Sequence, residues 1–451
     1  MNLRPTVALL PLPIAFAAGS IAARTLYARV PLRFRADSGQ PLAVVTAWGA
    51  HGEAAFAILA ATVAAGAAAT LVAMHRCART ATGSEGTAIL ATAALTAAAA
   101  LTWPFVFSSD AYAYAAYGAM AAAGIDPYAP VAFATHGAFV DAARAQWSGS
   151  FPVCVYGPAF VAVATEVVRA GAGNVAATLF GFRALAVAAF LTSIALLDRA
   201  LADTPPADRY RALCAYGLNP VCLWTAAEGH NDAFLMAAVM AAAAVARRNL
   251  PGGAFLMGLG ALIKAPAAVL ALGAGLHPQL GRARLRALTA AGAGVGVAAG
   301  LSLPVLLPAL RTVGAHGVYD PQVSVQGLFG PRIGVLLACA AAAWGLVLFE
   351  RGRAAGAAWL GIALMVALPN GYPWYAPWLL PWCLGAGWGA ASRALWAATI
   401  FSVARYLPDA AGTLGADAVR AAAAVAALPL AFALAELRLR IPTRKKVSVR
   451  S

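Results

Sequence analysis

Charged side chains are scarce in this sequence. Of its 451 residues only 11% are Asp, Glu, Lys or Arg, whereas 62% are hydrophobic. Soluble domains carry about 25% charged residues, so too few are present here to coat a water-facing surface of this size. The composition therefore excludes a soluble globular protein and predicts that lipid is the solvent for much of the chain.

Cysteine motifs and acidic residues are also few. The six cysteines show no CxxC or CxH spacing, so neither a zinc site nor a redox motif is indicated, and no metal or cofactor is expected. Asp and Glu number 17 against 32 Lys and Arg, which gives a net charge of +15. The basic residues gather in short clusters between apolar runs and in the tail from Arg438 to Arg450, as cytoplasmic loops beside anionic lipid headgroups do. This distribution predicts a membrane partner and no nucleic acid.

Long apolar runs are what the sequence has in abundance, and about 20 such residues cross the hydrocarbon core as a helix. Runs of roughly that length are 6–23, 54–74, 87–107, 176–197, 285–307 and 416–436. Shorter runs are 153–170, 212–227, 232–246, 252–275, 333–349, 355–369, 376–390 and 394–408. Together they predict an all-α fold, a polytopic transmembrane helical bundle of about 11–14 helices. The first run resembles a signal peptide, but no clear small-residue cleavage site follows it, so we interpret it as a retained span.

Basic segments predict which end of this bundle faces the cytoplasm. The segments expected inside are 75–81, 246–249, 281–286, 350–353 and the C-terminal tail. The segments expected outside are then 108–152, 308–332 and 370–375. One region departs from the positive-inside pattern. The alternation of spans places four basic residues on the outer side of the membrane, namely Arg24, Arg29, Arg33 and Arg35.

Two of the shorter runs do not read as simple crossings. The basic loop 198–211 favours the inside, so 176–197 is the span and 153–170 lies along the interface or re-enters. Pro266 stands in the middle of 252–275, which predicts a bent or broken helix pair.

The stretch FSSDAYAYAAYGAMAAAGIDPYAP (107–130) begins where an apolar run reaches the outer surface. Asp110 is the first acidic residue beyond that run, and Tyr114 and Tyr117 share its face if the helix continues. These residues form a candidate ligand-binding segment. A structural alternative stays open, in which Asp110 caps a juxtamembrane helix and the tyrosines form an interfacial aromatic belt.

The outer loop then turns and closes. Asp126, Pro127 and Tyr128 turn the chain, as Asp-Pro sequences tend to do. The loop ends with FPVCVYGPAF (151–160), a second aromatic segment punctuated by Pro and Gly that contains Tyr156.

A second polar constellation interrupts two apolar helices in YGLNPVCLWTAAEGHNDAFLM (216–236). Acidic residues exposed to lipid at the bilayer centre cost about 2.5–3.5 kcal/mol each, so the pentad EGHND must lie at the outer surface or face a wet cavity. Glu228 and Asp232 are four residues apart, which places both on one side of a helix. A plain surface hairpin is the structural alternative.

Isolated cations and clustered aromatics complete the candidates. Lys264 is a lone cation in an apolar run, and it either snorkels or faces the cavity and meets an anion such as a phosphate. Arg183 is a comparable cation for which snorkelling is favoured. The stretch LPNGYPWYAPWLLPW (368–382) contains Tyr372, Trp374, Tyr375 and Trp378, which anchor at the interface or stack on sugar rings. Weaker candidates in the outer segment 308–332 are His316, Tyr319, Asp320, Gln322, Gln326 and Arg332.

The order of these motifs resembles the GT-C superfamily of membrane glycosyltransferases. The motifs are SSDAYAYAAYG, DPYAP, YGPAF, NPVCLWTAAEGHNDAFLM, IKAP and YPWYAPW. The similarity is closest to the polyprenol-phosphomannose-dependent α-1,6-mannosyltransferase group and covers roughly residues 87–385. It implies N-terminal spans outside the similar module at 1–86, a catalytic transmembrane module at 87–385 with a large extracytoplasmic first loop at 108–152, and C-terminal spans with a basic cytoplasmic tail at 386–451.

The resemblance implies a glycosyltransferase that moves a sugar, expected to be mannose, from a polyprenyl-phosphate donor to an extracytoplasmic glycan or lipid acceptor. Asp110 matches the family's general base, which acts in one inverting displacement. The positions that match the surroundings of the active-site cavity are Asn219, Pro220, Glu228, His230, Asn231 and Asp232. The other expected substrate-binding residues are Tyr114, Tyr117, Asp126, Tyr128, Tyr156, Lys264, Arg332, Tyr372, Trp374 and Tyr375. The expected location is the bacterial inner membrane, with several crossings and the active site outside the cytoplasm.

Two other functions stay open on the residues alone. A transporter or flippase fits an intramembrane charge such as Lys264 and broken helices, although no inverted repeat is visible and the acids and aromatics collect on one side. A noncatalytic assembly protein of an envelope complex is the third hypothesis.

Overall fold

The computed structural model consists of helices and their connections. It describes residues 9–28, 52–79, 85–103, 108, 110–129, 135–146, 153–315, 322–384, 387–410 and 416–439. No strand occurs within these ranges, so the predicted all-α class is confirmed. Several expected features fall outside the described residues, namely Arg29, Arg33, Arg35, His316, Tyr319, Asp320 and the tail from 440.

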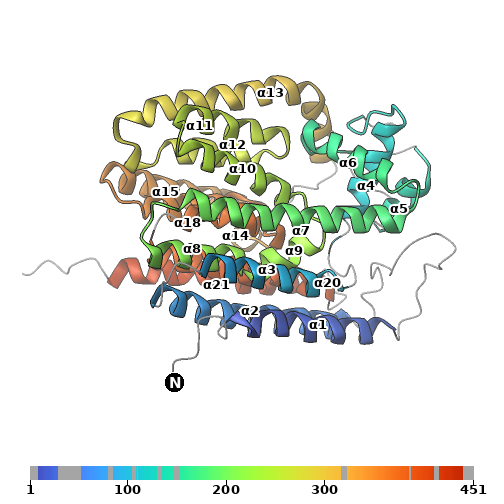
Figure 1. The fold of residues 1–451 in the computed structure, drawn as a ribbon, viewed down its shortest axis with the longest axis horizontal. Helices are drawn as coiled ribbons and strands as arrows, with labels where there is room; N and C mark the ends of the chain where they lie inside the picture. Colours follow the sequence, from blue (N-terminus) through green and yellow to red (C-terminus); the bar gives the residue numbers. More distant parts are fainter. Residues whose placement is uncertain are drawn as a thin grey trace, which may run out of the picture.

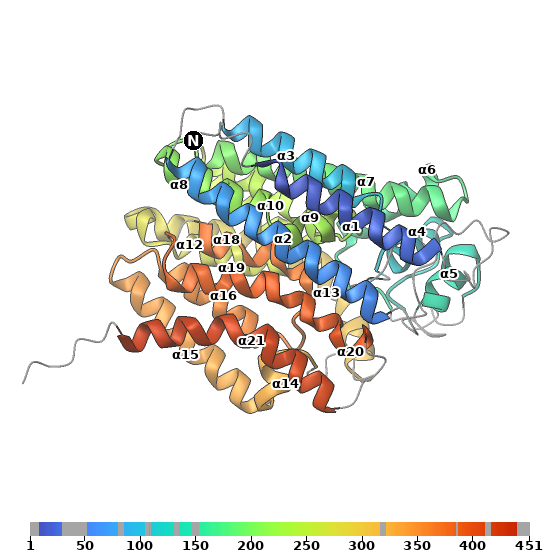
Figure 2. The same ribbon diagram turned by 90° about the horizontal axis from the view of Figure 1, so that it is seen from below.

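Helices of the main bundle run along the long axis of the molecule, roughly side by side (Figure 1, Figure 2). They are α1 (Pro11–Ala28), α2 (Gly52–Arg79), α3 (Glu85–Ala100), α7 (Val175–Ala200), α13 (Arg284–Ala315), α15 (Pro331–Glu350), α16 (Gly356–Ala367), α19 (Ala390–Phe401) and α21 (Ala416–Leu439). Each coincides with an apolar run of the sequence. Neighbours pack as α1 on α2, α15 on α16 and α19 on α21.

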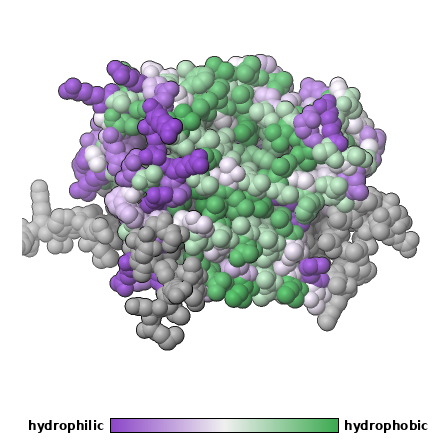
Figure 3. Space-filling model, viewed as in Figure 1, coloured by the Kyte–Doolittle hydropathy of each residue, from purple (hydrophilic) through white to green (hydrophobic). Residues whose placement is uncertain are grey.

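Five of the described helices are long and apolar enough to cross a membrane. They lie at Gly52–Arg76, Val175–Ala200, Pro278–Thr312, Pro331–Glu350 and Ala416–Leu434, and a sixth span results if the bent pair α9 (Pro220–Ala227) and α10 (Asp232–Ala246) counts as one. A hydrophobic band lies between two more hydrophilic ends (Figure 3). Large apolar side chains such as Ile14, Phe180 and Leu336 are exposed, as lipid-facing side chains must be. The chain is therefore a multi-pass membrane protein.

The runs 252–275 and 153–170 do not form single helices that cross the membrane. The run 252–275 is divided into α11 (Leu250–Leu259), the 3₁₀ turn η4 (Gly260–Leu262) and α12 (Pro266–Gly275). Pro266 is the first residue of α12, where its missing N–H costs nothing, so the predicted break is confirmed. The run 153–170 forms only the 13-residue helix α6 (Pro158–Ala170), which is too short to cross the hydrocarbon core alone.

The two ends of the bundle differ in character. At one end, on the right of Figures 1 and 2, α4 (Asp110–Ala122), α5 (Ala138–Gln146) and α6 form a small lobe. At the other end α8 (Pro206–Gly217) and η5 (Pro278–Ala283) connect the long helices, and basic residues are paired there. Arg209 binds Asp198 at 2.6 Å, and Arg247 binds Asp203 at 2.7 Å.

Short elements complete the chain on the C-terminal side. They are α14 (Val325–Phe329), η6 (Pro373–Tyr375), α17 (Ala376–Leu379), α18 (Pro381–Leu384), η7 (Ser402–Tyr406) and α20 (Leu407–Ala410). The 3₁₀ turn η6 packs against α9 and α17 packs against α10. These contacts bring the aromatic segment 372–378 to the break between α9 and α10.

Candidate active site

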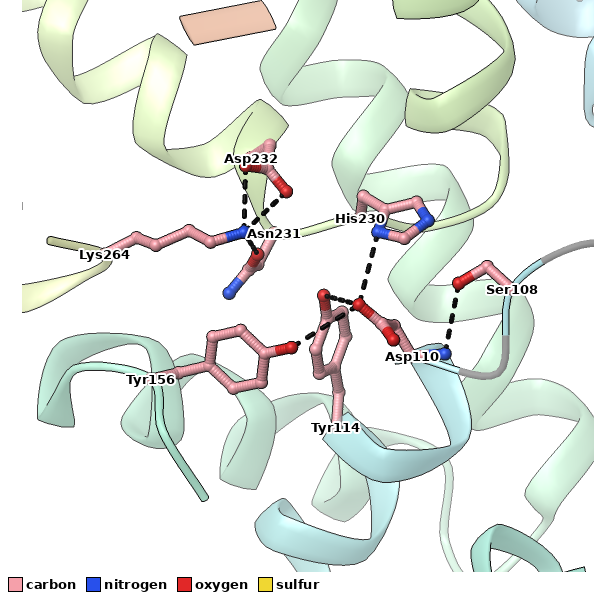
Figure 4. Close-up of polar contacts among 8 residues, drawn as sticks. All are labelled: Ser108, Asp110, Tyr114, Tyr156, His230, Asn231, Asp232 and Lys264. Carbon is pink, nitrogen blue, oxygen red and sulfur yellow. Dashed lines mark hydrogen bonds and ion pairs between the residues drawn. The ribbon is translucent and has the colours of Figure 1, made fainter. Parts of the chain in front are cut away.

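Asp110 is the first residue of α4, and residues close to it in the sequence supply two of its hydrogen-bond partners. The Asp110 N–H donates to Ser108 Oγ at 3.2 Å, and a carboxylate at a helix N-terminus is favoured by the helix dipole. One helical turn later, the Tyr114 hydroxyl donates to Asp110 Oδ2 at 3.3 Å (Figure 4). The predicted common face of Asp110 and Tyr114 is therefore confirmed.

Tyr156 reaches the same carboxylate from the closing segment of the loop. Its hydroxyl donates to Asp110 Oδ2 at 3.4 Å (Figure 4). The turn at 126–128 fixes this segment: Asp126 Oδ1 accepts from the Tyr128 N–H at 2.9 Å, and the Tyr128 hydroxyl donates to the Tyr156 carbonyl at 2.8 Å. Asp126 and Tyr128 thus act on Asp110 indirectly, by holding Tyr156.

The break between α9 and α10 brings His230 to the other side of Asp110. The two helices are bent by 117°, and Gly229 takes φ +87° at the bend, a conformation that favours glycine. His230 is 1% exposed, and its Nδ1 lies 3.5 Å from Asp110 Oδ2. The EGHND segment is consequently buried at the end of the bundle next to Asp110, rather than forming the surface hairpin that was its structural alternative.

Lys264 forms a second charged group on the opposite side of the site. Its Nζ binds the two carboxylate oxygens of Asp232 at 2.8 and 2.9 Å and Asn231 Oδ1 at 3.1 Å (Figure 4). The same Nζ lies 5.6 Å from the ring centroid of Tyr156, within cation–π range. Lys264 does not snorkel. Asp110 with His230 and Asp232 with Lys264 therefore face each other across Tyr156.

The environment of Asp110 keeps its carboxylate ionised. Burial raises the pKa of Asp110, but the neighbouring His230 ring, Lys264 and the Tyr114 hydroxyl together outweigh burial and hold it below its ordinary value. The side chain is 12% exposed, so the carboxylate lies at the edge of the protein interior, where it can accept a proton at neutral pH.

A column of stacked planar groups backs His230. The His230 ring stacks on Trp374 with centroids 4.5 Å apart, and Trp374 stacks on Tyr372 at 4.3 Å. The Arg405 guanidinium lies 5.2 Å from the Tyr372 ring centroid and donates to Gln322 Oε1 at 2.8 Å. Both faces of Trp374 are therefore covered by protein groups.

A family model with the description alpha-(1->6)-mannopyranosyltransferase, N-terminal domain, matches residues 15–279. That range is more than half of the chain. The chain belongs to this family of mannosyltransferases. The resemblance to membrane glycosyltransferases that the sequence motifs indicate is thereby confirmed, and the chain is an enzyme of the GT-C type. No curated protein and no solved structure matches it.

The matched range divides the candidate site of the mannosyltransferase into two contributions. Asp110, Tyr156, His230 and Lys264 lie within residues 15–279. The aromatic column from Tyr372 to Arg405 lies beyond it. The C-terminal part of the chain thus completes the surroundings of a site whose charged residues belong to the matched N-terminal domain.

Several expected site residues have partners away from Asp110. Asn219 is the N-cap of α9, where its Oδ1 accepts from Val221 and Cys222 N–H groups and its Nδ2 donates to Thr399. Tyr117 is buried with its ring centroid 6.3 Å from that of Tyr156. Arg332 is exposed near the start of α15 and, within the described residues, makes none of the contacts that join the site. Tyr375 contacts Tyr372 edge-on at 5.7 Å.

Arg183 corrects one expectation. Snorkelling to the interface is wrong for it, because the side chain is 7% exposed and donates to backbone carbonyls. Its Nε donates to the Ala227 carbonyl at 2.5 Å and its Nη2 to the Trp103 carbonyl at 3.0 Å. Buried Glu228 lies within electrostatic reach of the same guanidinium. Arg183 thus ties α7 to the C-terminal ends of α3 and α9, directly before the EGHND bend.

Sequence reasoning did not select Arg405 or Ser108. Arg405 lies in SVARYLPD, a segment with no pattern that links it to Tyr372. Ser108 is part of the SSD sequence before α4, where a serine preceding a helix is a common cap signal. Among the described residues, no group of three or more His, Cys, Asp or Glu side chains is arranged to hold a metal ion.

Proposed function

We propose that this enzyme transfers mannose from a polyprenyl-phosphate donor to a hydroxyl group of a mannose-containing acceptor, at the membrane surface where α4, α5 and α6 lie. The family supports an α-1,6 linkage in the product. The single observation that carries the proposal is the largely buried carboxylate of Asp110, held by Tyr114, Tyr156 and His230.

In the proposed reaction Asp110 acts as a general base. The acceptor oxygen attacks the anomeric carbon of the donor sugar, and its proton passes to an oxygen of Asp110. The bond between the anomeric carbon and the phosphate oxygen breaks at the same time, and the phosphate leaves as a lipid monoester. A single displacement inverts the anomeric carbon, so an α-linked product requires a β-linked donor. General-base help of this kind contributes about 10²–10⁴-fold to the rate.

Lys264 and Asn231 are proposed to receive the donor phosphate, because negative charge grows on the leaving group. The Lys264 ammonium has three donors, and in this structure they face three oxygens of Asn231 and Asp232. Binding of a phosphate therefore requires that one of these bonds be exchanged. The Asn231 Nδ2 group is buried and has no hydrogen-bond partner among the described residues, which suits it to an oxygen of the ligand.

The orientation of the protein follows from its basic end. Arg79, Arg247 and Arg351 lie at or next to the ends of α2, α10 and α15, at the end opposite α4. By the positive-inside rule we propose that this end faces the cytoplasm and that Asp110, α4, α5 and α6 face outside. We also propose that shorter apolar helices such as α3 and α16, which run between the same two ends, cross the bilayer and add to the five or six long spans.

The proposed catalytic module extends from residue 87 to 385. The matched N-terminal domain ends at 279, but Trp374 and Tyr372 back His230 from beyond it. The proposed donor is a polyprenyl-phosphate mannose, and the proposed acceptor is a glycan or a glycolipid outside the cytoplasm.

Replacement of the proposed base tests the function. In proteoliposomes with a synthetic polyprenyl-phosphate mannose, Asp110→Asn is expected to lower the rate of mannose transfer by about 10²–10⁴-fold. Asp141→Asn is the matched control, since Asp141 is an exposed acid on α5 in the same lobe and pairs with Arg144. Near wild-type turnover of Asp110→Asn would reject the assignment of the base.

A further inference from the structure

A polar cavity of about 650 Å³ lies at the end of the bundle opposite Asp110. It is lined by Leu71, Met74, His75, Arg79, Arg211 and Trp388. Leu71, His75 and Arg79 follow one another at four-residue spacing and so share a face of α2. Arg211 comes from α8, which packs on α2. Among the described residues, the side chains that line this cavity include no carboxylate.

The polar cavity shares lining residues with a second cavity, and the second shares lining residues with an apolar third. Arg211 and Trp388 also line a neighbouring cavity of about 470 Å³. That cavity in turn shares His277 and Gln279 with a third, of about 340 Å³. The third cavity is lined mainly by apolar side chains of α7, α10, α11, α12 and α18, among them Val239, Met240, Met257, Leu270 and Trp382. The three cavities are thus neighbours in series, from one lined by arginines to one lined mainly by apolar side chains.

The charged side chains that line these cavities have a net positive charge. Arg79 and His75 come from α2, and Arg211 and Asp208 come from α8. Asp208 binds Arg211 at 2.7 Å, so this pair is close to neutral and Arg79 supplies the excess positive charge. His277, which lines the second and third cavities, accepts from the Gln279 N–H through Nδ1 at 3.4 Å.

We infer that these three cavities form a binding site for one anionic phospholipid, whose phosphate lies at Arg79 and Arg211 and whose acyl chains extend into the apolar cavity. The polar cavity with its arginines suits a negatively charged headgroup, and the apolar cavity suits hydrocarbon chains. Together they match one amphiphilic lipid. The position of the site, at the basic end of the spanning helices, places it where anionic headgroups collect. The site lies at the opposite end from the proposed transfer reaction and does not depend on it.

Native mass spectrometry of the full-length enzyme in neutral detergent tests the head of this site. Added phosphatidylglycerol is expected to bind at one lipid per protein, with phosphatidylcholine binding far more weakly. The double variant Arg79→Gln/Arg211→Gln should weaken phosphatidylglycerol binding by about thirtyfold, roughly fivefold per arginine. Arg351→Gln/Arg353→Gln removes two exposed arginines that belong to the same end but line none of these cavities, and it should bind as the unmodified protein does.

Two further measurements separate a lipid from a free phosphate. Ala243→Phe fills the apolar cavity without touching either arginine, and it should weaken binding of dioleoyl phosphatidylglycerol about tenfold. Inorganic phosphate at millimolar concentration should not displace the lipid. Three results would each overturn the inference. They are an equal loss of phosphatidylglycerol binding in the two double arginine variants, unchanged binding in Ala243→Phe, and full displacement of the lipid by inorganic phosphate. Retained mannose transfer and a single peak in gel filtration show that each variant is folded.

Discussion

The two tyrosine hydroxyls that donate to Asp110 Oδ2 differ in what holds them. Tyr114 lies one turn along the same helix, whereas Tyr156 depends on the 126–128 turn across the loop. A hydrogen bond to a charged acceptor contributes about 1.5–3 kcal/mol, and both bonds are long, so the lower value applies. Tyr156→Phe is therefore expected to lower kcat about tenfold.

The matched control for Tyr156→Phe is Tyr216→Phe. The Tyr216 hydroxyl is also buried, but it bonds Ser193 in the body of the bundle. Steady-state transfer assays of both variants should show a loss of kcat only for Tyr156→Phe. Equal losses would mean that the Tyr156 hydroxyl supports the fold and not the carboxylate.

The pH dependence of transfer should reflect the low pKa of Asp110. Because the partners of Asp110 hold its pKa below the ordinary value of 3.8, the carboxylate stays ionised as the pH falls from 7.5 to 5. The proposed base is then lost only below that range, as protons add to Asp110. Transfer rates at saturating donor between pH 5 and 7.5 should show no acid limb caused by the base. An acid limb near pH 6 that persists in His230→Asn would contradict this assignment.

At the residue scale, local pairs are predictable and distant pairs are not. The face shared by Asp110 and Tyr114 follows from helical spacing, and the turn at 126–128 follows from an Asp-Pro pair. The Lys264–Asp232 pair joins the break between η4 and α12 to the start of α10, so the sequence indicates only that each charge needs a partner. An Asn-Pro pair before a helix is typical of an N-cap, which is the role of Asn219 in the structure. The family resemblance predicted a position near the cavity for this residue instead.

Trp374 links η6 to the catalytic end of the molecule through His230. Since both faces of its ring are covered, by His230 and by Tyr372, the structure favours a positioning role over stacking on a sugar. Trp374→Leu removes the stack and is expected to lower kcat at least tenfold with little change in KM. Trp374→Phe keeps an aromatic face and should restore most of the loss.

Steady-state kinetics distinguish the two roles of Trp374. A residue that binds donor and transition state equally raises KM and leaves kcat unchanged when it is removed. That result in Trp374→Leu would support direct contact with the sugar and would contradict the positioning role. Tyr375→Phe, which keeps the neighbouring ring, is the control for general disturbance of the segment.

At the scale of elements, proline and length are the signals that the sequence carries well. Pro266 divides 252–275 as predicted, and 153–170 is too short to cross. The run 376–390 is less regular than its hydropathy suggests, because Pro377 and Pro381 divide it into the short helices α17 and α18. How η6 packs on α9 depends on tertiary contacts between segments far apart in the chain, which no periodicity encodes.

For the whole molecule, composition alone establishes the membrane class, since so few charges leave lipid as the main solvent. The alternation of helix direction is also predictable, because the ends of α2, α10 and α15 and the start of α13, which lie at or next to expected basic segments, gather at one end (Figure 1). The joining of the matched N-terminal domain to the C-terminal aromatic column is not predictable in this way. It arises because the helices α16 to α19 return to the break between α9 and α10.

The proposed orientation makes a prediction about the accessibility of the two ends. In intact cells, a membrane-impermeant maleimide should label a cysteine introduced at Asp126, which is exposed in the lobe beside α4. It should not label a cysteine introduced at exposed Arg353, at the basic end, until the membrane is permeabilised. The unmodified protein gives the background from its own cysteines, of which Cys339 is exposed. Labelling of the Arg353 position alone in intact cells would reverse the orientation and place Asp110 on the cytoplasmic side, where a donor from the outer leaflet does not reach it.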